Sequence, residues 1–142
     1  MSKELIAYCG LYCGGCRVYQ ATQAGKPEHY EDGSPMVCTG CRSLGPVAAW
    51  CDTQCAIKQC CRDRGVDNCL ACDDNPCDKM TGFMRDPAYP YHLEVQDNMT
   101  RLREIGPDAW VRAMEARYRC KACAQTFNWF ERSCSACGQP TP

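Results

Sequence analysis

The chain has 142 residues and a formal net charge of −1, a length that suits one ordinary domain or two small ones. Its 16 cysteines mark a cysteine scaffold, and without them the apolar share falls to roughly a third, which is low for a soluble domain. These figures exclude a fold held by aliphatic burial alone, so metal ions or disulfides must stabilise it.

Residues 1–80 contain 12 of the cysteines, in sequence that glycine and aspartate interrupt often. Two short helices are expected here, over 14–24 and 53–64. Gly25 and Gly65 follow them directly, where glycine commonly ends a helix. The region is therefore expected to be helix-rich but irregular.

Two further helix starts are predicted among these cysteines. A helix that begins near Asp52 or Thr53 would place Cys51 and Cys55 on one side, because their spacing is close to one helical turn. Pro76 would open another helix as its first residue, a position that proline favours.

Residues 81–116 contain no cysteine and show helical periodicity. The first helix has a single apolar face, formed by Val95, Met99, Leu102 and Ile105. Gly106 ends this helix, and Pro107 opens a second one. The apolar side of the second helix consists of Trp110, Val111, Met114 and Tyr118. Since amphipathic faces usually join the core, we expect a helical hairpin packed on the cysteine-rich region rather than a partner-binding helix.

Residues 117–142 carry the most specific local motif, two C-x-x-C pairs separated by ten residues. Its cysteines are Cys120, Cys123, Cys134 and Cys137. Each pair would supply two thiolates to one tetrahedral zinc ion, with sulfur at about 2.3 Å. Gly138 would allow a positive φ after the second pair, and residues 125–130 are expected to form a strand beside the metal. Rubredoxin-type iron sites have a similar arrangement, so iron is the rival ion.

The expected cellular compartment favours metal sites over disulfides as the role of the cysteines. The amino terminus lacks the apolar segment of a secretory signal, and no run of about 18 apolar residues could span a membrane. We therefore expect a cytoplasmic protein with no membrane partner, in which clustered reduced cysteines are metal ligands. The predicted fold class is α+β, with a small helix-rich, irregular metal-stabilised domain over 1–116 and a C-terminal, rubredoxin-like zinc ribbon over 117–142.

An ordered series of cysteine motifs characterises the amino-terminal part. It runs from Cys9-Gly-Leu-Tyr-Cys13-Gly-Gly-Cys16 through Cys38-Thr-Gly-Cys41, Cys55-Ala-Ile-Lys-Gln-Cys60 and Cys69-Leu-Ala-Cys72 to Pro76-Cys77. The first motif has the spacing of radical S-adenosylmethionine enzymes, which hold a [4Fe–4S] cluster. Those enzymes carry an aromatic residue where this chain has Gly15, and they need a longer partial barrel.

The whole series, over about residues 5–105, resembles the family catalogued as domain of unknown function 3795, which is common in anaerobic bacteria and archaea. The resemblance implies a small cysteine-rich, metal-binding protein and supplies no activity. It implies metal ligands at Cys9, Cys13, Cys16, Cys38, Cys41, Cys51, Cys55, Cys60, Cys69, Cys72 and Cys77. Cys61 departs from the family, which usually has a small apolar residue there.

The number of metal sites is open at this level. Eleven family cysteines do not divide into four-ligand sites, whereas twelve, with Cys61, would give three. One site would otherwise need a non-cysteine ligand or bridging sulfurs. His29 and His92 lack ligand spacing and are expected in the surface or core. With the ribbon, the chain would hold up to four zinc ions.

Three functions are compatible with these motifs. The leading hypothesis is a structural, interaction or metal-handling zinc module, for which a protein partner is plausible. No catalytic motif is recognised, so the sequence does not predict an enzyme. The second hypothesis is an iron–sulfur or redox protein, with iron or a cluster in residues 1–116, because such clusters bind closely spaced thiolates.

The third hypothesis is a nucleic-acid-binding ribbon. Residues 1–116 carry 12 Lys and Arg against 16 Asp and Glu, a balance of −4 that disfavours phosphate binding there. Residues 117–142 carry four against one, a balance of +3. The ribbon's aromatic side chains would either stack on bases or form a miniature aromatic core. They are Tyr118, Phe127, Trp129 and Phe130.

Overall fold

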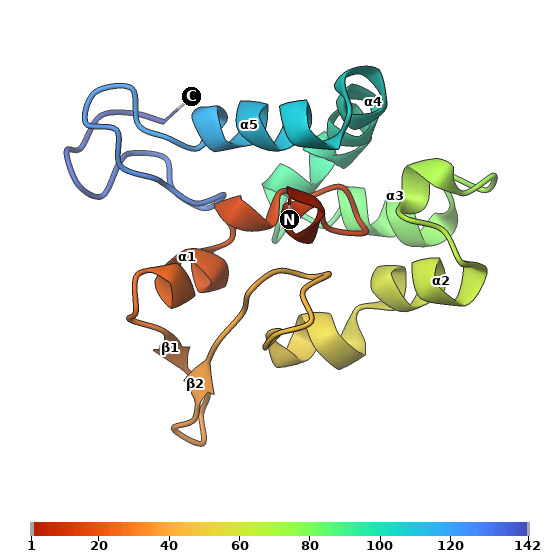
Figure 1. The fold of residues 1–142 in the computed structure, drawn as a ribbon, viewed down its shortest axis with the longest axis horizontal. Helices are drawn as coiled ribbons and strands as arrows, with labels where there is room; N and C mark the ends of the chain where they lie inside the picture. Colours follow the sequence, from red (N-terminus) through yellow and green to blue (C-terminus); the bar gives the residue numbers. More distant parts are fainter. Residues whose placement is uncertain (1, 142) are drawn as a thin grey trace.

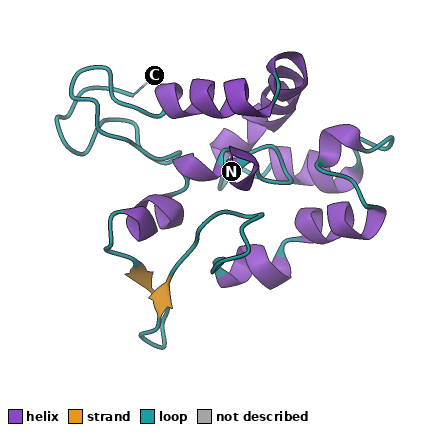
Figure 2. Cartoon of the chain, viewed as in Figure 1, coloured by secondary structure: helices purple, strands orange, loops and turns teal. Residues whose placement is uncertain are grey.

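Short helices joined by loops make up most of the computed structural model, which describes residues 2–141 (Figure 2). The α-helices are α1 (Arg17–Gln23), α2 (Ala56–Arg64), α3 (Asp78–Met84), α4 (Val95–Ile105) and α5 (Pro107–Arg117). The 3-10 turns are η1 (Ser2–Leu5), η2 (Cys13–Gly15), η4 (Cys69–Ala71) and η5 (Pro90–Glu94), and η3 (Trp50–Gln54) is a π-helical turn. A small antiparallel sheet pairs β1 (Glu28–His29) with β2 (Pro35–Met36). The prediction of a helix-rich α+β fold is confirmed.

The two amino-terminal helices stop where glycine predicts and begin later than expected. α1 starts at Arg17 because Cys13–Gly15 form a 3-10 turn and Cys16 is extended, with φ −79° and ψ 131°. The consecutive glycines Gly14 and Gly15 make the segment Cys13–Gly15 a poor start for an α-helix. α2 ends at Gly65, whose left-handed φ of 67° suits a residue without a Cβ atom.

The predictions for Cys51, Cys55 and Pro76 are wrong. Cys51 lies in the π-helical turn, whereas Cys55 is extended and precedes α2, so the two do not share a helical face. α3 begins at Asp78 rather than at Pro76, because Cys77 is extended and its carbonyl accepts the first helical hydrogen bond, from Thr81 N–H at 2.9 Å.

The helical hairpin of α4 and α5 agrees with its prediction (Figure 1). Gly106 joins the helices with a φ of 82°, and Pro107 is the first residue of α5. Val95 and Met99 are completely buried on α4, while Leu102 and Ile105 are partly buried. The predicted apolar side of α5, with Tyr118 directly after it, is buried in full. The Trp110 indole N–H donates to the Asn98 carbonyl at 2.8 Å, which ties the two helices together.

Cysteines are a substantial part of the core. Two groups of buried side chains run through the molecule, one around Met80, Val95 and Met99, the other around Trp110 and Met114. Within residues 3–141, whose burial the structure describes, eight of the 21 buried apolar residues are cysteines, so the aliphatic core is as thin as the composition suggests. Among residues 2–141, no helix is both long and apolar enough to cross a membrane.

The four-cysteine segment packs against the amino-terminal part of the chain. Figure 1 shows its blue ribbon reaching the turn that precedes α1. Trp129 N–H donates to the Gly15 carbonyl at 3.0 Å, and the Gln20 side chain donates to the Phe127 carbonyl at 2.9 Å. The Tyr12 and Tyr118 rings stack with centroids 6.0 Å apart. Division of the chain into two domains at residue 116 stays a prediction.

This contact makes Gly15 a test of how the two parts are joined. A Cβ atom at Gly15 would lie 2.4 Å from Nε1 of the Trp129 indole, a large and well-packed group. Gly15→Ala should therefore lower the free energy of unfolding by about 1–3 kcal/mol through overpacking. Chemical denaturation of the metal-loaded protein measures this change.

Gly82→Ala is the matched control. Gly82 lies exposed in α3, where a Cβ atom meets nothing within 4 Å, so alanine should leave stability unchanged or raise it by about 0.5–1 kcal/mol. Equal stabilities for the two variants would contradict the tight contact between Gly15 and Trp129.

Candidate metal centres

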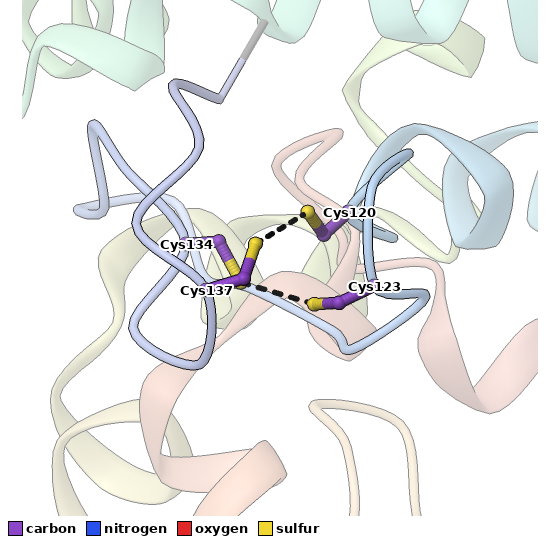
Figure 3. A group of neighbouring side chains, drawn as sticks. All are labelled: Cys120, Cys123, Cys134 and Cys137. Carbon is purple, nitrogen blue, oxygen red and sulfur yellow. Dashed lines mark hydrogen bonds between the residues drawn. The ribbon is translucent and has the colours of Figure 1, made fainter.

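The four carboxy-terminal cysteines form one compact cluster. Their sulfurs all lie within 4.8 Å of one another. Figure 3 shows the four side chains converging from two turns of the chain. Cys120 and Cys137 sulfurs are 3.6 Å apart, and so are those of Cys123 and Cys134. Four sulfurs at about 2.3 Å from one tetrahedral ion would be about 3.8 Å from each other. The cluster therefore has dimensions that fit a single metal ion, and it is compatible with the predicted zinc ribbon.

Two nearly identical turns position these sulfurs. Ala124 N–H donates to the Cys120 carbonyl and Gly138 N–H to the Cys134 carbonyl, both at 2.8 Å. Cys120 and Cys134 each donate back, at 2.7 Å, to the carbonyl five residues later. The fifth residue of each turn has a left-handed φ, 65° at Ala124 and 78° at Gly138. The sequence revealed this conformation only at Gly138, because alanine gives no such signal.

The expected strand over 125–130 is wrong. In its place, single antiparallel bridges pair Arg119 with Thr126 and Ser133 with Pro140. A tight turn interrupts the segment, since the Asn128 side chain accepts from Phe130 N–H at 3.0 Å and the Glu131 carboxylate accepts from Asn128 N–H at 2.8 Å. Asparagine favours such local side-chain hydrogen bonds over strand pairing.

The thiols of this cluster differ in how readily they ionise. The backbone N–H groups of Cys123 and Ala122 donate to the Cys120 sulfur and lower its pKa to about 7. At Cys137 the Gln139 N–H favours the thiolate, but partial desolvation and neighbouring sulfurs outweigh it and raise the pKa to about 12. Without a cation, therefore, the four thiols do not all ionise at neutral pH. A bound metal ion would displace the remaining protons.

A second group contains seven cysteines around η2 and η3. Its members are Cys9, Cys13, Cys16, Cys38, Cys41, Cys51 and Cys55. Burial raises the pKa values of Cys9, Cys13, Cys16 and Cys51, and the charges of Cys41 and Cys38 add to this effect. Burial is the largest cause and, with these neighbours, raises the pKa of Cys51 to about 12.

Backbone N–H groups favour ionisation of several of these thiols. The N–H groups of Leu11, Cys41 and Tyr8 act against burial and lower the pKa values of Cys9, Cys13 and Cys41, respectively. Such hydrogen bonds favour thiolates, the form that binds metal. Within residues 2–141, however, only the carboxy-terminal cluster brings three or more potential metal ligands within 4.8 Å of one another. The seven thiols therefore lie in one region of the structure, but no three of them are within 4.8 Å of one another.

Lys58 is a buried cation beside this group that the sequence gives no reason to expect. It lies on α2 and is 2% exposed, and none of the ion pairs within residues 2–141 includes it. Burial raises the pKa of Cys41, while the Tyr8 N–H and the positive charge of Lys58 act in the opposite direction. A buried ammonium group normally needs an anionic partner, and thiolates of this group would supply one.

The remaining predicted ligands, Cys60, Cys69, Cys72 and Cys77, line a cavity between α2 and α3, together with Cys61. Both histidines lie where the sequence predicts. His29 is exposed on β1. His92 is buried and stacks on Phe83 with ring centroids 3.7 Å apart, while its Nδ1 lies 3.0 Å from the Phe83 carbonyl.

The aromatic residues of the ribbon mainly pack. Tyr118 and Phe127 are buried, and the Trp129 ring lies 4.9 Å from that of Tyr91. Phe130 is 47% exposed but also contacts Tyr91 edge to face. These side chains therefore pack the ribbon against the rest of the protein.

Comparison with known proteins identifies a family. Residues 5–82 match the family described as "Protein of unknown function (DUF3795)", which covers more than half of the chain. No curated protein and no solved structure matches the chain. The match ends before α4, so the helical hairpin and the four-cysteine ribbon lie beyond it.

Proposed function

The chain belongs to the DUF3795 family, and we propose from the geometry of its thiols that it is a zinc-binding protein with several all-cysteine sites. One observation carries the proposal, the four sulfurs of Cys120, Cys123, Cys134 and Cys137 within 4.8 Å of one another. Zinc fills tetrahedral sites with four thiolates, whereas calcium and magnesium prefer oxygen ligands. In this site the ion has no open position, which favours a structural role over catalysis.

The surroundings of the cluster support a structural role. Cys120 and Cys134 belong to the same buried group as Trp110 and Met114 of α5, so a metal at this point would fix the ribbon to the helical hairpin. The metal thereby replaces apolar core that a segment this short cannot provide. We further propose that the protein acts in the reducing cytoplasm, as a metal-stabilised module for interaction or metal handling, because unpaired cysteines in such number persist there.

Substitution of one ribbon ligand tests the proposal. Cys137→Ser should reduce the zinc content by one ion per chain, because a neutral hydroxyl group is a much poorer ligand than a thiolate. Ser135→Ala is the matched control, since Ser135 is exposed in the same turn and should leave the zinc content unchanged. Elemental analysis of protein purified under reducing, anaerobic conditions measures both. Equal zinc contents for Cys137→Ser and wild type would refute a zinc site in the ribbon.

An iron–sulfur centre in the seven-cysteine group is the second candidate. Seven neighbouring thiols with backbone N–H donors and one buried lysine resemble the environment that such clusters need. Thiolate-bound iron absorbs strongly in the visible. A brown anaerobic preparation would support this candidate, and a colourless one would leave zinc as the ion of this group.

A further inference from the structure

Five cysteines line a single cavity of about 220 Å³ between α2, η4 and α3. They are Cys60, Cys61, Cys69, Cys72 and Cys77. The cavity lies apart from the ribbon and draws its sulfurs from three successive segments of the chain. A wall so rich in thiols is suited to a thiophilic metal ion.

The sulfurs of Cys61 and Cys69 lie close together in this cavity. They are 3.7 Å apart, far beyond the roughly 2.05 Å of a disulfide. The same separation, 3.6 Å, occurs twice in the ribbon cluster, and about 3.8 Å is expected between two thiolates on one tetrahedral ion. Cys61 and Cys69 therefore already stand as two ligands of one ion would.

The chain reverses direction between Cys61 and Cys69, which brings the two residues together. Gly65, with a φ of 67°, ends α2, and Val66 N–H returns to the Cys61 carbonyl at 3.0 Å. The Asn68 side chain then caps η4 by accepting from Leu70 N–H at 2.9 Å. Because η4 is itself the C-x-x-C turn, the same cap orients Cys69 and Cys72.

Cys77 completes the set from the start of α3. The loop that leads to it is held by two hydrogen bonds between the Asn75 and Gln96 side chains, of 3.3 and 3.0 Å. Cys77 lines the same cavity as Cys61 and Cys69.

A positive charge also faces the cavity. Arg64 Nη1 donates to the Cys72 sulfur at 3.3 Å and contacts the Asp74 carboxylate at 2.8 Å. Four thiolates around a divalent ion carry a formal charge of −2, because each thiol loses its proton on binding. The guanidinium would offset part of that charge, and its hydrogen bond is stronger to a thiolate than to a thiol.

Cys60 is the less suitable neighbour. Consecutive residues of an α-helix point about 100° apart, so Cys60 and Cys61 cannot direct their sulfurs at the same point equally well. Cys61 is 2% exposed and touches Cys69, whereas Cys60 is half-buried. The geometry points to a metal site formed by Cys61, Cys69, Cys72 and Cys77, with Arg64 as its counter-charge. The Cys61–Cys69 pair is already in place, whereas Cys72 and Cys77 would have to move closer on metal binding, because among residues 2–141 only the ribbon holds three or more such ligands within 4.8 Å of one another. This inference rests on the proposed function, since the ion would be the same zinc, and it replaces Cys60 by Cys61 as ligand.

Cadmium-113 NMR of the full-length wild-type protein tests the site without a mutation. Cadmium replaces zinc in thiolate sites, and scalar coupling identifies the cysteine β-protons bound to each ion. One cadmium resonance is expected to correlate with Cys61, Cys69, Cys72 and Cys77, and a separate one with the four ribbon cysteines. A spectrum in which the ribbon resonance is complete and no cadmium couples to Cys61 would overturn the inference and leave the proposed function intact. Loss of the ribbon resonance itself would refute the proposed function.

Paired variants give an independent measurement. Native mass spectrometry should show one metal ion fewer in Cys61→Ala than in wild type, and an unchanged number in Cys60→Ala. The reverse pattern, with the ion lost from Cys60→Ala alone, would assign the fourth ligand to Cys60 and overturn the inference. If Cys61→Ala does not fold, the cadmium spectrum of the wild type decides.

Discussion

Removal of the bound metal should unfold most of the protein. Structural zinc in small domains contributes about 10–16 kcal/mol of apparent binding free energy, which is folding free energy where no site exists in the unfolded chain. In the part of the chain that the structure describes, eight of the 21 buried apolar residues are cysteines, so the remaining core is too small to compensate. A high-affinity chelator, with a reductant present throughout, should therefore abolish near-ultraviolet circular dichroism and collapse the dispersion of the amide NMR spectrum.

Re-addition of zinc provides the control for this experiment. Both signals should return if metal removal alone caused the loss, whereas oxidised thiols would prevent recovery. A chelated protein that keeps a dispersed spectrum would contradict a metal-stabilised fold. The α4–α5 hairpin is the segment best able to persist, because its buried face is formed by Val95, Met99, Trp110 and Met114 rather than by thiols.

Replacement of Lys58 by methionine is expected to have the second-largest effect. The Lys58 residue is 2% exposed, and its positive charge favours the thiolate of Cys41. Under the proposed function, metal-bound thiolates of the seven-cysteine group would be its counter-charge. Removing one partner of a buried charge pair leaves the other uncompensated, which costs about 3–5 kcal/mol. Lys58→Met should therefore destabilise the metal-loaded protein by about 3 kcal/mol and weaken metal retention by this group, as measured by urea unfolding and elemental analysis.

Lys79→Met separates this effect from a general loss of positive charge. Lys79 is exposed on α3, so its replacement should change stability by less than about 0.5 kcal/mol. If the seven thiols stay neutral, Lys58 has no anion to balance, and methionine should stabilise the fold by relieving a buried ammonium group. Equal or greater stability of Lys58→Met relative to wild type would thus exclude thiolates in this group.

Local features of the structure could be predicted from the sequence. The four ribbon sulfurs meet because each C-x-x-C pair is held by its own turn, and a spacing of ten residues suffices to bring the turns together. The hairpin was predictable because Gly106-Pro107 interrupts two clear apolar faces. Helix stops at Gly65 and Gly106 follow from the left-handed or otherwise positive φ that glycine adopts there.

Features that depend on distant contacts could not be predicted. The neighbourhood of Cys9 includes Cys41 and Cys55, which lie more than thirty residues further along the chain, and no local pattern encodes that proximity. Cys61 is not predicted as a ligand because its neighbour Cys60 fits the family order. The 3.7 Å distance between the Cys61 and Cys69 sulfurs arises from the chain reversal after α2, which the sequence does not predict. The burial of Lys58 could not be predicted, because lysine is rarely buried and nothing in the sequence marks Lys58 as an exception.

X-ray absorption at the zinc edge of the purified full-length protein tests the central claim most directly. Metal held by cysteine alone predicts a first coordination shell of sulfur only, at about 2.3 Å, with four sulfurs per zinc on average. A shell dominated by nitrogen or oxygen at about 2.0–2.1 Å, or a protein that retains no metal, would contradict the account.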